Sequence, residues 1–388
     1  MHDFDEVINR YNTYSTQWDY TVDRFGSADV LPLSISDTDF SAPKEVISAL
    51  QKRLDHPVFG YTRWNHSDYK HSIVSWFKER SNSVIDPDWI VYSPSVIFSV
   101  ATLMRLKSCE GDGVVLLTPM YDAFYGVVKE NKRRLIEVNI DSAMDGYGLD
   151  WEGLEKACSD PSNKVLILTN PHNPSGKVFS HEELEKIVRI AADTHTYIIS
   201  DDIHRDIVYK KDAYHPITDI TTKNVALACS ATKTFNIPGL GGSYVFIPDE
   251  GLREEFLVEL KQKNALSSAS IMGITAQMAS YNECAYYVDE MVTYTKRNME
   301  LVKDYLEVKF PEMRFEVPDA TYLAWIDVSG LNMSDQEIQR RLVEVGKVGI
   351  MSGATYGKRG YLRMNVGCPR SKVEEALRRM TYGIRSQL

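Results

Sequence analysis

Short apolar runs alternate with longer amphipathic stretches between about residues 90 and 250. The apolar runs are rich in β-branched residues, which favour strands. Their alternation with helical patterns is typical of βα units that build a mostly parallel sheet. The predicted strands are 114–119, 165–170, 197–201, 225–230 and 243–247. We therefore expect an α/β fold with a mostly parallel sheet flanked by helices.

Residues 180–194, between the second and third predicted strands, have the pattern of a crossover helix. Ser180 and Glu183 match the capping box that marks a helix start. Apolar side chains then recur at the spacing of one helix face, at Leu184, Ile187, Val188 and Ala191. Such a helix would connect two parallel strands across one face of the sheet.

The last hundred residues show an α+β pattern instead. A long polar helix is predicted at 289–308, strands at 322–328 and 361–366, and a further helix at 335–345. The first forty or so residues carry helix and loop signals but no core of their own. We therefore predict a large domain at 45–285 and a smaller domain formed by both chain ends, 1–44 and 286–388.

Composition and charge narrow the class of protein. Of 388 residues, 43% are hydrophobic and 25% are charged, as in ordinary globular domains. The formal net charge of −10 argues against nucleic-acid binding, which depends on clustered Lys and Arg. No apolar run approaches the length of a membrane span, and the N-terminus lacks a signal-peptide pattern. We expect a cytoplasmic protein without a membrane or nucleic-acid partner.

Cysteine and histidine spacings argue against disulfide or metal chemistry. The five cysteines are odd in number, widely separated and never in a C-x-x-C arrangement. We expect them to be reduced, buried thiols. The nine histidines show no spacing that converges with each other or with cysteines, so no metal site is predicted.

Polar segments follow three of the predicted strands. The sequence N-P-H-N-P-S-G occupies residues 170–176, D-D-I-H occupies 201–204, and S-A-T-K occupies 230–233. Ligands of open α/β sheets bind beyond the carboxyl ends of the strands. We therefore expect these three segments to meet at one edge of the sheet and to form the functional site.

Lys233 and Asp201 are the first candidates for chemistry. A desolvated lysine amine can form an imine with an aldehyde, although a single loop lysine is more often simply exposed. A buried carboxylate such as Asp201 can keep a ring nitrogen protonated, although an Asp after a strand is also a common helix N-cap. Asp202 should point the other way and is the weaker candidate.

Three further side chains are candidates for ligand contacts. Asn173 lies between two prolines that stiffen its loop, although a turn asparagine has the same pattern. The Tyr121 ring could lie on a flat ligand, or it could belong to the core. Arg363 interrupts an apolar strand-like run, which fits a grip on a substrate carboxylate or an internal salt bridge.

Ser95 precedes a helix predicted at about 96–107. The backbone N–H groups of Val96 and Ile97 would open this helix and offer a site for a phosphate group. Ser95 is equally compatible with a plain N-cap.

Taken together, these segments resemble the fold type I family of enzymes that use pyridoxal 5′-phosphate (PLP), the aspartate-aminotransferase-like superfamily. The resemblance covers essentially the whole chain and is carried by the ordered set N-P-H-N-P-S-G, S-D-D-I-H, S-A-T-K and L-R-M-N. Within that superfamily the chain is similar to the MalY/PatB-type cystathionine β-lyases. The segments that carry this closer similarity are 16–20, 34–40, 58–64, 119–125, 233–238 and 365–372.

The resemblance implies a role for each candidate. Lys233 would bind the cofactor covalently and, with Tyr61, serve in catalysis. The implied cofactor contacts are Ser95, Val96, Ile97, Tyr121, Asn173, Asp201, His204, Ser230, Thr232 and Lys233. The implied substrate contacts are Ser36, Tyr61, Trp64, Asn173 and Arg363. Tyr61 would reach the site of a neighbouring subunit, so the resemblance also implies a homodimer with shared active sites.

Two residues depart from the aminotransferase pattern. His204 stands where those enzymes usually have a tyrosine near the phenolic oxygen of the cofactor, and Gly241 stands where they have a phosphate-binding arginine. Both departures weaken an aminotransferase assignment. They also leave the phosphate site with less positive charge.

The implied activity is β-elimination from cystathionine, L-cysteine or another S-substituted cysteine. It would yield a thiol, either homocysteine or hydrogen sulfide, together with pyruvate and ammonia. The alternative is an aminotransferase acting on amino acids. The family resemblance also raises a second role, regulation through a protein partner. The preferred substrate does not follow from the sequence.

Overall fold

A seven-stranded sheet lies at the centre of the larger part of the chain. The computed structural model describes residues 2–386. The strands lie in the order β2-β8-β7-β6-β5-β3-β4. Their bounds are β2 Ile90–Ser93, β3 Gly113–Thr118, β4 Arg134–Asn139, β5 Asn163–Thr169, β6 Tyr197–Asp201, β7 Val225–Cys229 and β8 Ser243–Phe246.

The predicted mostly parallel sheet is confirmed. Strands β3 to β7 run parallel, and β8 runs antiparallel to both of its neighbours, β7 and β2. All five predicted strands are present, with bounds that differ by at most two residues. The sequence analysis missed β2, which has four residues, and β4, whose first side chain is a charged Arg134. Strand β4 is partly exposed and lacks the continuous apolar run that marked the others, whereas β2 is buried but only four residues long.

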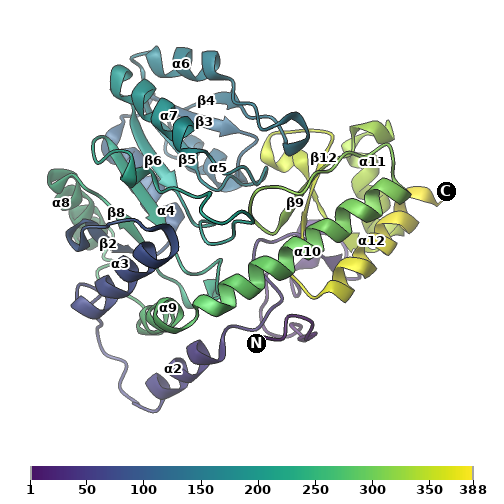
Figure 1. Cartoon of the computed structure of the whole chain (residues 1–388), viewed down its shortest axis with the longest axis horizontal. Helices are drawn as coiled ribbons and strands as arrows, with labels where there is room; N and C mark the ends of the chain where they lie inside the picture. The colour runs from purple at the N-terminus through teal and green to yellow at the C-terminus, as the bar shows by residue number, and fades with distance from the viewer. Residues whose placement is uncertain (1, 387–388) are drawn as a thin grey trace.

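Helices cover both faces of this sheet (Figure 1). Helix α4 (Val96–Lys107) contacts both α5 (Asp122–Glu130) and α8 (Glu250–Val258), and α6 (Trp151–Ser159) contacts α7 (His181–Thr194). The capping box predicted for α7 is present, since the Glu183 backbone N–H donates to Ser180 Oγ at 3.2 Å. Two more helices, α3 (Ser67–Ser81) and α9 (Ile271–Glu283), pack against each other.

The C-terminal part forms smaller sheets. An antiparallel sheet has the order β11-β12-β9, with bounds Met351–Ser352, Tyr361–Asn365 and Leu323–Asp327. Helices α10 (Ala285–Lys309), α11 (Asp335–Arg340) and α12 (Arg370–Arg385) belong to the same part of the chain (Figure 1). The helix predicted at 335–345 ends its regular turns at Arg340 and continues as a wider π-turn to Val345. Within residues 2–386, no helix combines the length and apolarity needed to cross a membrane.

The N-terminal segment packs with the C-terminal part. Strand β1 (Leu31–Pro32) pairs in parallel with β10 (Val348–Gly349), and α1 (Thr21–Phe25) ends shortly before β1. The domain bounds of 45–285, and of 1–44 with 286–388, stay a prediction. The outermost residues of the smaller predicted domain, 1 and 387–388, lie outside the described residues.

Asp39 joins these two chain ends. Its carboxylate accepts hydrogen bonds from Arg10 at 2.8 Å, from the Trp18 indole at 2.9 Å and from Lys372 at 2.5 Å. Burial alone would raise the pKa of Asp39, but Lys372, Trp18 and Arg10 together lower it below its ordinary value. The folded state is therefore stabilised when Asp39 is ionised.

All five cysteines are free, as expected, but one of them is not buried. Cys109 is exposed because it lies in the turn between α4 and β3. The expectation of buried thiols is therefore wrong for this residue.

Replacing Asp39 by Asn should lower the free energy of unfolding at pH 7 by about 3 kcal/mol, because the largely buried Lys372 side chain loses its counterion and Arg10 keeps only Asp37. The folded pKa lies below the ordinary value of 3.8, so this stabilisation is present above pH 3.8 and disappears as the pH falls further. Urea unfolding at fixed protein concentration measures both effects. The control is Glu375→Gln in the surface pairs of α12, which should change stability by at most about 1 kcal/mol. Equal effects of both variants would contradict the prediction.

Candidate active site

The three polar segments predicted to meet do surround one cavity of about 200 Å³. It lies at the carboxyl ends of β5, β6 and β7 and at the start of α4. Of the predicted site residues, those that line it are Ser36, Ser95, Val96, Ile97, Tyr121, Asn173, Asp201, His204, Ser230, Thr232 and Lys233. Sequence reasoning missed the smaller lining residues, among them Pro94, Thr169, Ile203 and Ser243. Their side chains carry no distinctive chemistry.

Lys233 follows β7 and extends its amine into the cavity. Its Nζ donates to the Ser36 carbonyl oxygen at 2.8 Å and to Ser36 Oγ at 3.1 Å. The pKa of Lys233 is lowered to about 8: burial and the charge of Arg363 lower it, and the charges of Asp37 and Asp201 offset part of the shift. About a tenth of the amine is therefore neutral at pH 7, far more than for an ordinary lysine, and the neutral form is the one that acts as a nucleophile or a base.

Asp201 ends β6 and faces the same cavity. Its Oδ1 accepts the backbone N–H of Ile203 at 3.1 Å. Burial raises the pKa of Asp201 to about 7, against the opposing effects of Ile203 and Lys233. A cationic ring nitrogen placed beside it would favour the ionised carboxylate.

Asp202 points away from the cavity, as predicted. The hydroxyls of Ser200 and Tyr214 both donate to its carboxylate. Adjacent residues of an extended strand project to opposite faces, which explains why only one of the two acids reaches the site.

Arg363, on β12, approaches the cavity from the smaller sheet. Its Nη1 donates to Asn173 Oδ1 and its Nη2 to the Ser34 carbonyl oxygen, both at 3.0 Å. The Tyr356 ring lies 4.2 Å from the centre of the guanidinium. Within residues 2–386, no carboxylate forms an ion pair with it, and its buried Nε has no hydrogen-bond partner. This arrangement fits a substrate carboxylate rather than the alternative of an internal salt bridge.

The start of α4 forms a cradle for an anion. Ser95 Oγ accepts the backbone N–H of Phe98 at 3.1 Å, so Ser95 is also a plain N-cap, and the N–H groups of Val96 and Ile97 remain available. Ser230 Oγ donates to the Gly242 carbonyl oxygen at 2.8 Å. Lys233 is the one Lys or Arg among the residues that line the cavity. The phosphate end therefore relies on neutral donors.

His204 is buried at the edge of the cavity and is neutral. Burial lowers its pKa to about 3, and the positive charges of Lys233 and Arg363 contribute to the shift. Its buried Nδ1 has no hydrogen-bond partner among the described residues. A ligand oxygen or hydroxyl would satisfy that nitrogen.

Tyr61 and Trp64 do not line this cavity. Tyr61 is fully exposed, at 100% of its accessible surface, whereas Trp64 is buried in the core. Tyr121 does line the cavity, where burial raises the pKa of its hydroxyl.

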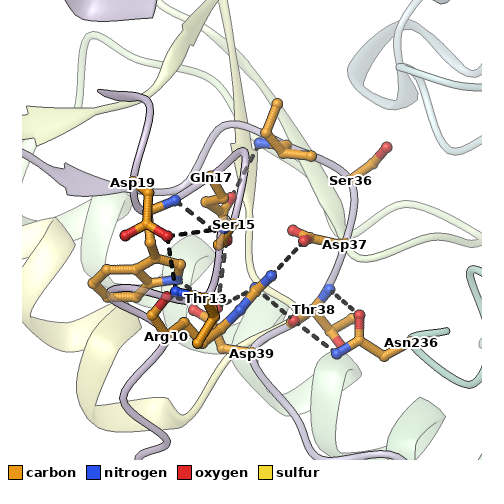
Figure 2. Close-up of polar contacts among 12 residues, drawn as sticks. Arg10, Thr13, Ser15, Gln17, Asp19, Ser36, Asp37, Thr38, Asp39 and Asn236 are labelled. Atoms are coloured by element: carbon orange, nitrogen blue, oxygen red, sulfur yellow. Dashed lines mark hydrogen bonds and ion pairs between the residues drawn. The ribbon is translucent and has the colours of Figure 1, made fainter. Parts of the chain in front are cut away.

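The segment from Ser34 to Asp39, which carries Ser36, is fixed on several sides. Arg10 donates to Asp37 Oδ2 at 2.7 Å, and the Asn236 side chain is bonded to the backbone of Thr38 (Figure 2). The Asn365 amide donates to the carbonyl oxygens of Ile35 and Asp37. Sequence reasoning identified the segment itself but missed these supports, because they are distant in the chain and follow no spacing rule.

The donor set fits PLP. An amine is available for its aldehyde, a buried carboxylate for its ring nitrogen, and unpaired N–H groups at a helix start for its phosphate. The unpartnered His204 Nδ1 and Arg363 Nε are the polar atoms that a bound cofactor and an amino-acid substrate would satisfy.

Comparisons with known proteins support this fit. The chain matches the family "Aminotransferase class I and II" over residues 28–380. It is 40% identical to protein MalY of Escherichia coli (strain K12), over 100% of both chains. It is 35% identical to the cystathionine beta-lyase PatB of Bacillus subtilis (strain 168), over 97% of this chain and 98% of that relative. A PLP-bound putative aminotransferase from Clostridium difficile 630 superposes with a TM-score of 0.95 at 35% identity, covering 99% of this chain and all of the other.

The Lys233 amine should react with acetic anhydride at lower pH than ordinary lysines. We expect half-maximal labelling of the apoprotein near pH 8, following its lowered pKa, against about 10.4 for unperturbed lysine. Peptide mass spectrometry over a pH series measures this, with exposed lysines of the same sample as internal controls. A midpoint equal to that of the exposed lysines would show that the amine is not desolvated.

Proposed function

The chain belongs to the aminotransferase class I and II family, and within it we propose that the protein is a PLP-dependent carbon–sulfur β-lyase. The predicted resemblance to MalY/PatB-type lyases is confirmed by the full-length relatives of those names, and the expected fold type is confirmed by the family match. One observation carries the proposal: Lys233 and Asp201 line one cavity together with Asn173, and Asn173 is bonded to Arg363, whose buried Nε has no hydrogen-bond partner among the described residues.

When bound, PLP supplies an aldehyde that joins amines and a ring that withdraws electrons from the Cα atom of an attached amino acid. Lys233 would hold the aldehyde carbon, and Asp201 the ring nitrogen. Asn173 and His204 would contact the phenolic oxygen, and Tyr121 the ring face. The phosphate would be held by Ser95, Val96, Ile97, Ser230 and Thr232.

Arg363 would orient the substrate by its α-carboxylate. Asn173 holds one side of the guanidinium and the Ser34 carbonyl the other, so the side chain is positioned before any substrate arrives. Preorganisation of this kind reduces the ordering cost of binding. Ser36 and Asn173 would complete the substrate contact.

Lys233 would act as the base. Once the substrate amine has displaced it, its neutral amine can take the proton from Cα. The electron pair left at Cα would then expel the Cβ sulfur as a thiolate, and the proton taken up by Lys233 would be available to convert it to a thiol. The remaining fragment hydrolyses to pyruvate and ammonia.

The alternative is an aminotransferase, the description given to the structural neighbour from Clostridium difficile. An aminotransferase would share the proton removal by Lys233 but would keep the Cβ substituent. His204 and Gly241 argue against it, because both replace residues typical of aminotransferases, and relatives named as cystathionine beta-lyases favour the lyase.

Incubation of the holoenzyme with cystathionine and no keto acid should release pyruvate, ammonia and homocysteine in equal amounts. Lys233→Arg should lower this rate at least about 100-fold, because the base is lost while a positive charge is kept. Coupled pyruvate and thiol assays measure both. Transfer of the amino group to an added keto acid, without thiol release, would establish the aminotransferase instead.

We further propose a homodimer in which Tyr61 enters the site of the other protomer. Helix α2 (Lys44–Leu54) and the loop after it lie away from the central sheet (Figure 1). They expose a group of large apolar side chains, Ile47, Leu54, Val58, Phe59 and Tyr61. Clustered exposed apolar residues are typical of protein interfaces.

Mixing Lys233→Ala and Tyr61→Ala protomers tests the shared site. Each variant alone should be nearly inactive, but a hybrid dimer carries both substitutions in one site and leaves the other site intact. After random exchange, half of the dimers are hybrids, so activity should recover to about a quarter of wild type. No recovery, despite hybrid formation shown by differently tagged protomers, would place Tyr61 outside a shared site.

The same proposal covers a second substrate, the location of the protein and its regulation. L-cysteine as substrate would yield hydrogen sulfide as the thiol product. A cytoplasmic location is favoured by the five unpaired cysteines, since disulfides are typical of oxidising compartments. Regulation through a protein partner stays a prediction.

A further inference from the structure

The contact between Lys233 and Ser36 has a geometry that suits the lysine after it has left the cofactor. Its Nζ donates to the Ser36 carbonyl oxygen at 2.8 Å and to Ser36 Oγ at 3.1 Å. A lysine ammonium has three N–H donors. Two of them would point at Ser36, and the third would remain for the substrate.

Ser36 keeps its position without help from Lys233. The Tyr322 hydroxyl donates to the Ser36 carbonyl oxygen at 2.9 Å. On either side of Ser36, the Asn365 amide holds the carbonyl oxygens of Ile35 and Asp37 at 2.5 and 2.6 Å. The acceptors for the amine are therefore part of a fixed loop.

The charge beside Ser36 favours the protonated amine. Arg10 donates to Asp37 Oδ2 at 2.7 Å, which orients the carboxylate, while the buried Asp37 Oδ1 has no partner. The groups that face Lys233 are Asp37 and Asp201, which raise its pKa, Arg363, which lowers it, and His204, which is neutral near pH 7. Asp37 is the member of this set that adjoins Ser36.

We propose that Ser36, backed by Asp37, forms a dock that holds the released Lys233 ammonium between proton removal and proton delivery. This inference rests on the proposed lyase function. The proton passes from Cα to Nζ. The C–S bond then breaks with its electron pair leaving on sulfur, and the docked ammonium returns the proton to the thiolate. Ser36 is thus a positioning residue for the amine in addition to the substrate contact implied by the family resemblance.

A direct test is the labelling midpoint of Lys233 in the full-length apoprotein, with acetic anhydride as the probe. Ser36→Ala should lower the midpoint by about one pH unit, because an acceptor that favours the charged form is lost. Asp37→Asn should shift it in the same direction. A merely loosened site would admit water and raise the midpoint instead, so the sign separates the dock from general disruption.

Thr38→Val is the matched control. Its Oγ1 is buried on the same loop and has no hydrogen-bond partner among the described residues, so the midpoint should stay at the wild-type value. Equal midpoints for Ser36→Ala and Thr38→Val would overturn the proposal.

In the holoenzyme, Ser36→Ala should lower kcat on cystathionine about tenfold with KM changed less than about twofold, because Arg363 still binds the carboxylate. An increase in KM with kcat unchanged would overturn the dock and leave Ser36 a substrate contact alone. If wild type released no thiol, the lyase function would fail, whereas the labelling midpoints would still decide whether Ser36 stabilises the ammonium.

Discussion

The hydrogen bonds from Lys233 to Ser36 join two segments that are 197 residues apart in sequence. Lys233 follows a strand of the large sheet, whereas Ser36 belongs to a loop held by Arg10 and Asn365, which come from the two chain ends. The site therefore exists only where the two parts of the chain pack together. The large part supplies most of the groups, and the chain ends supply Ser36 and Arg363.

The same packing explains the electrostatics of the site. Lys233, Asp201 and Arg363 are withdrawn from water, which penalises their charged forms. Of these three residues, Lys233 and Asp201 line the cavity, and their pKa values are about 8 and about 7. Stability alone would not explain why buried ionisable side chains are retained without ion partners. Their retention is understandable if cofactor and substrate supply the missing charges.

Local patterns were sufficient to predict the central strands, helix α7 and the residues at the strand ends, because a parallel sheet brings its carboxyl ends together irrespective of loop detail. Asp201, Asn173 and Lys233 follow that rule. Arg10, Asn236 and Asn365 could not be predicted in the same way, since their partners are backbone atoms and acids chosen by tertiary packing. Tyr61 belongs to a third group. Its role is implied by family resemblance alone, and because its side chain is fully exposed, it could act only on the site of a second chain.

Gly241 has a consequence for how tightly the enzyme would bind its cofactor. It lines the cavity at a φ of +71°, where any other residue would be strained although a Cβ atom would meet nothing within 4 Å, so this backbone offers the phosphate no cationic side chain. A phosphate held by neutral donors is bound less tightly than one in a charge-assisted pair. Without the covalent bond to Lys233, the cofactor would be held by these phosphate contacts together with Asp201 and Tyr121. The fraction of active protein would then follow the concentration of free vitamin-derived cofactor in the cell.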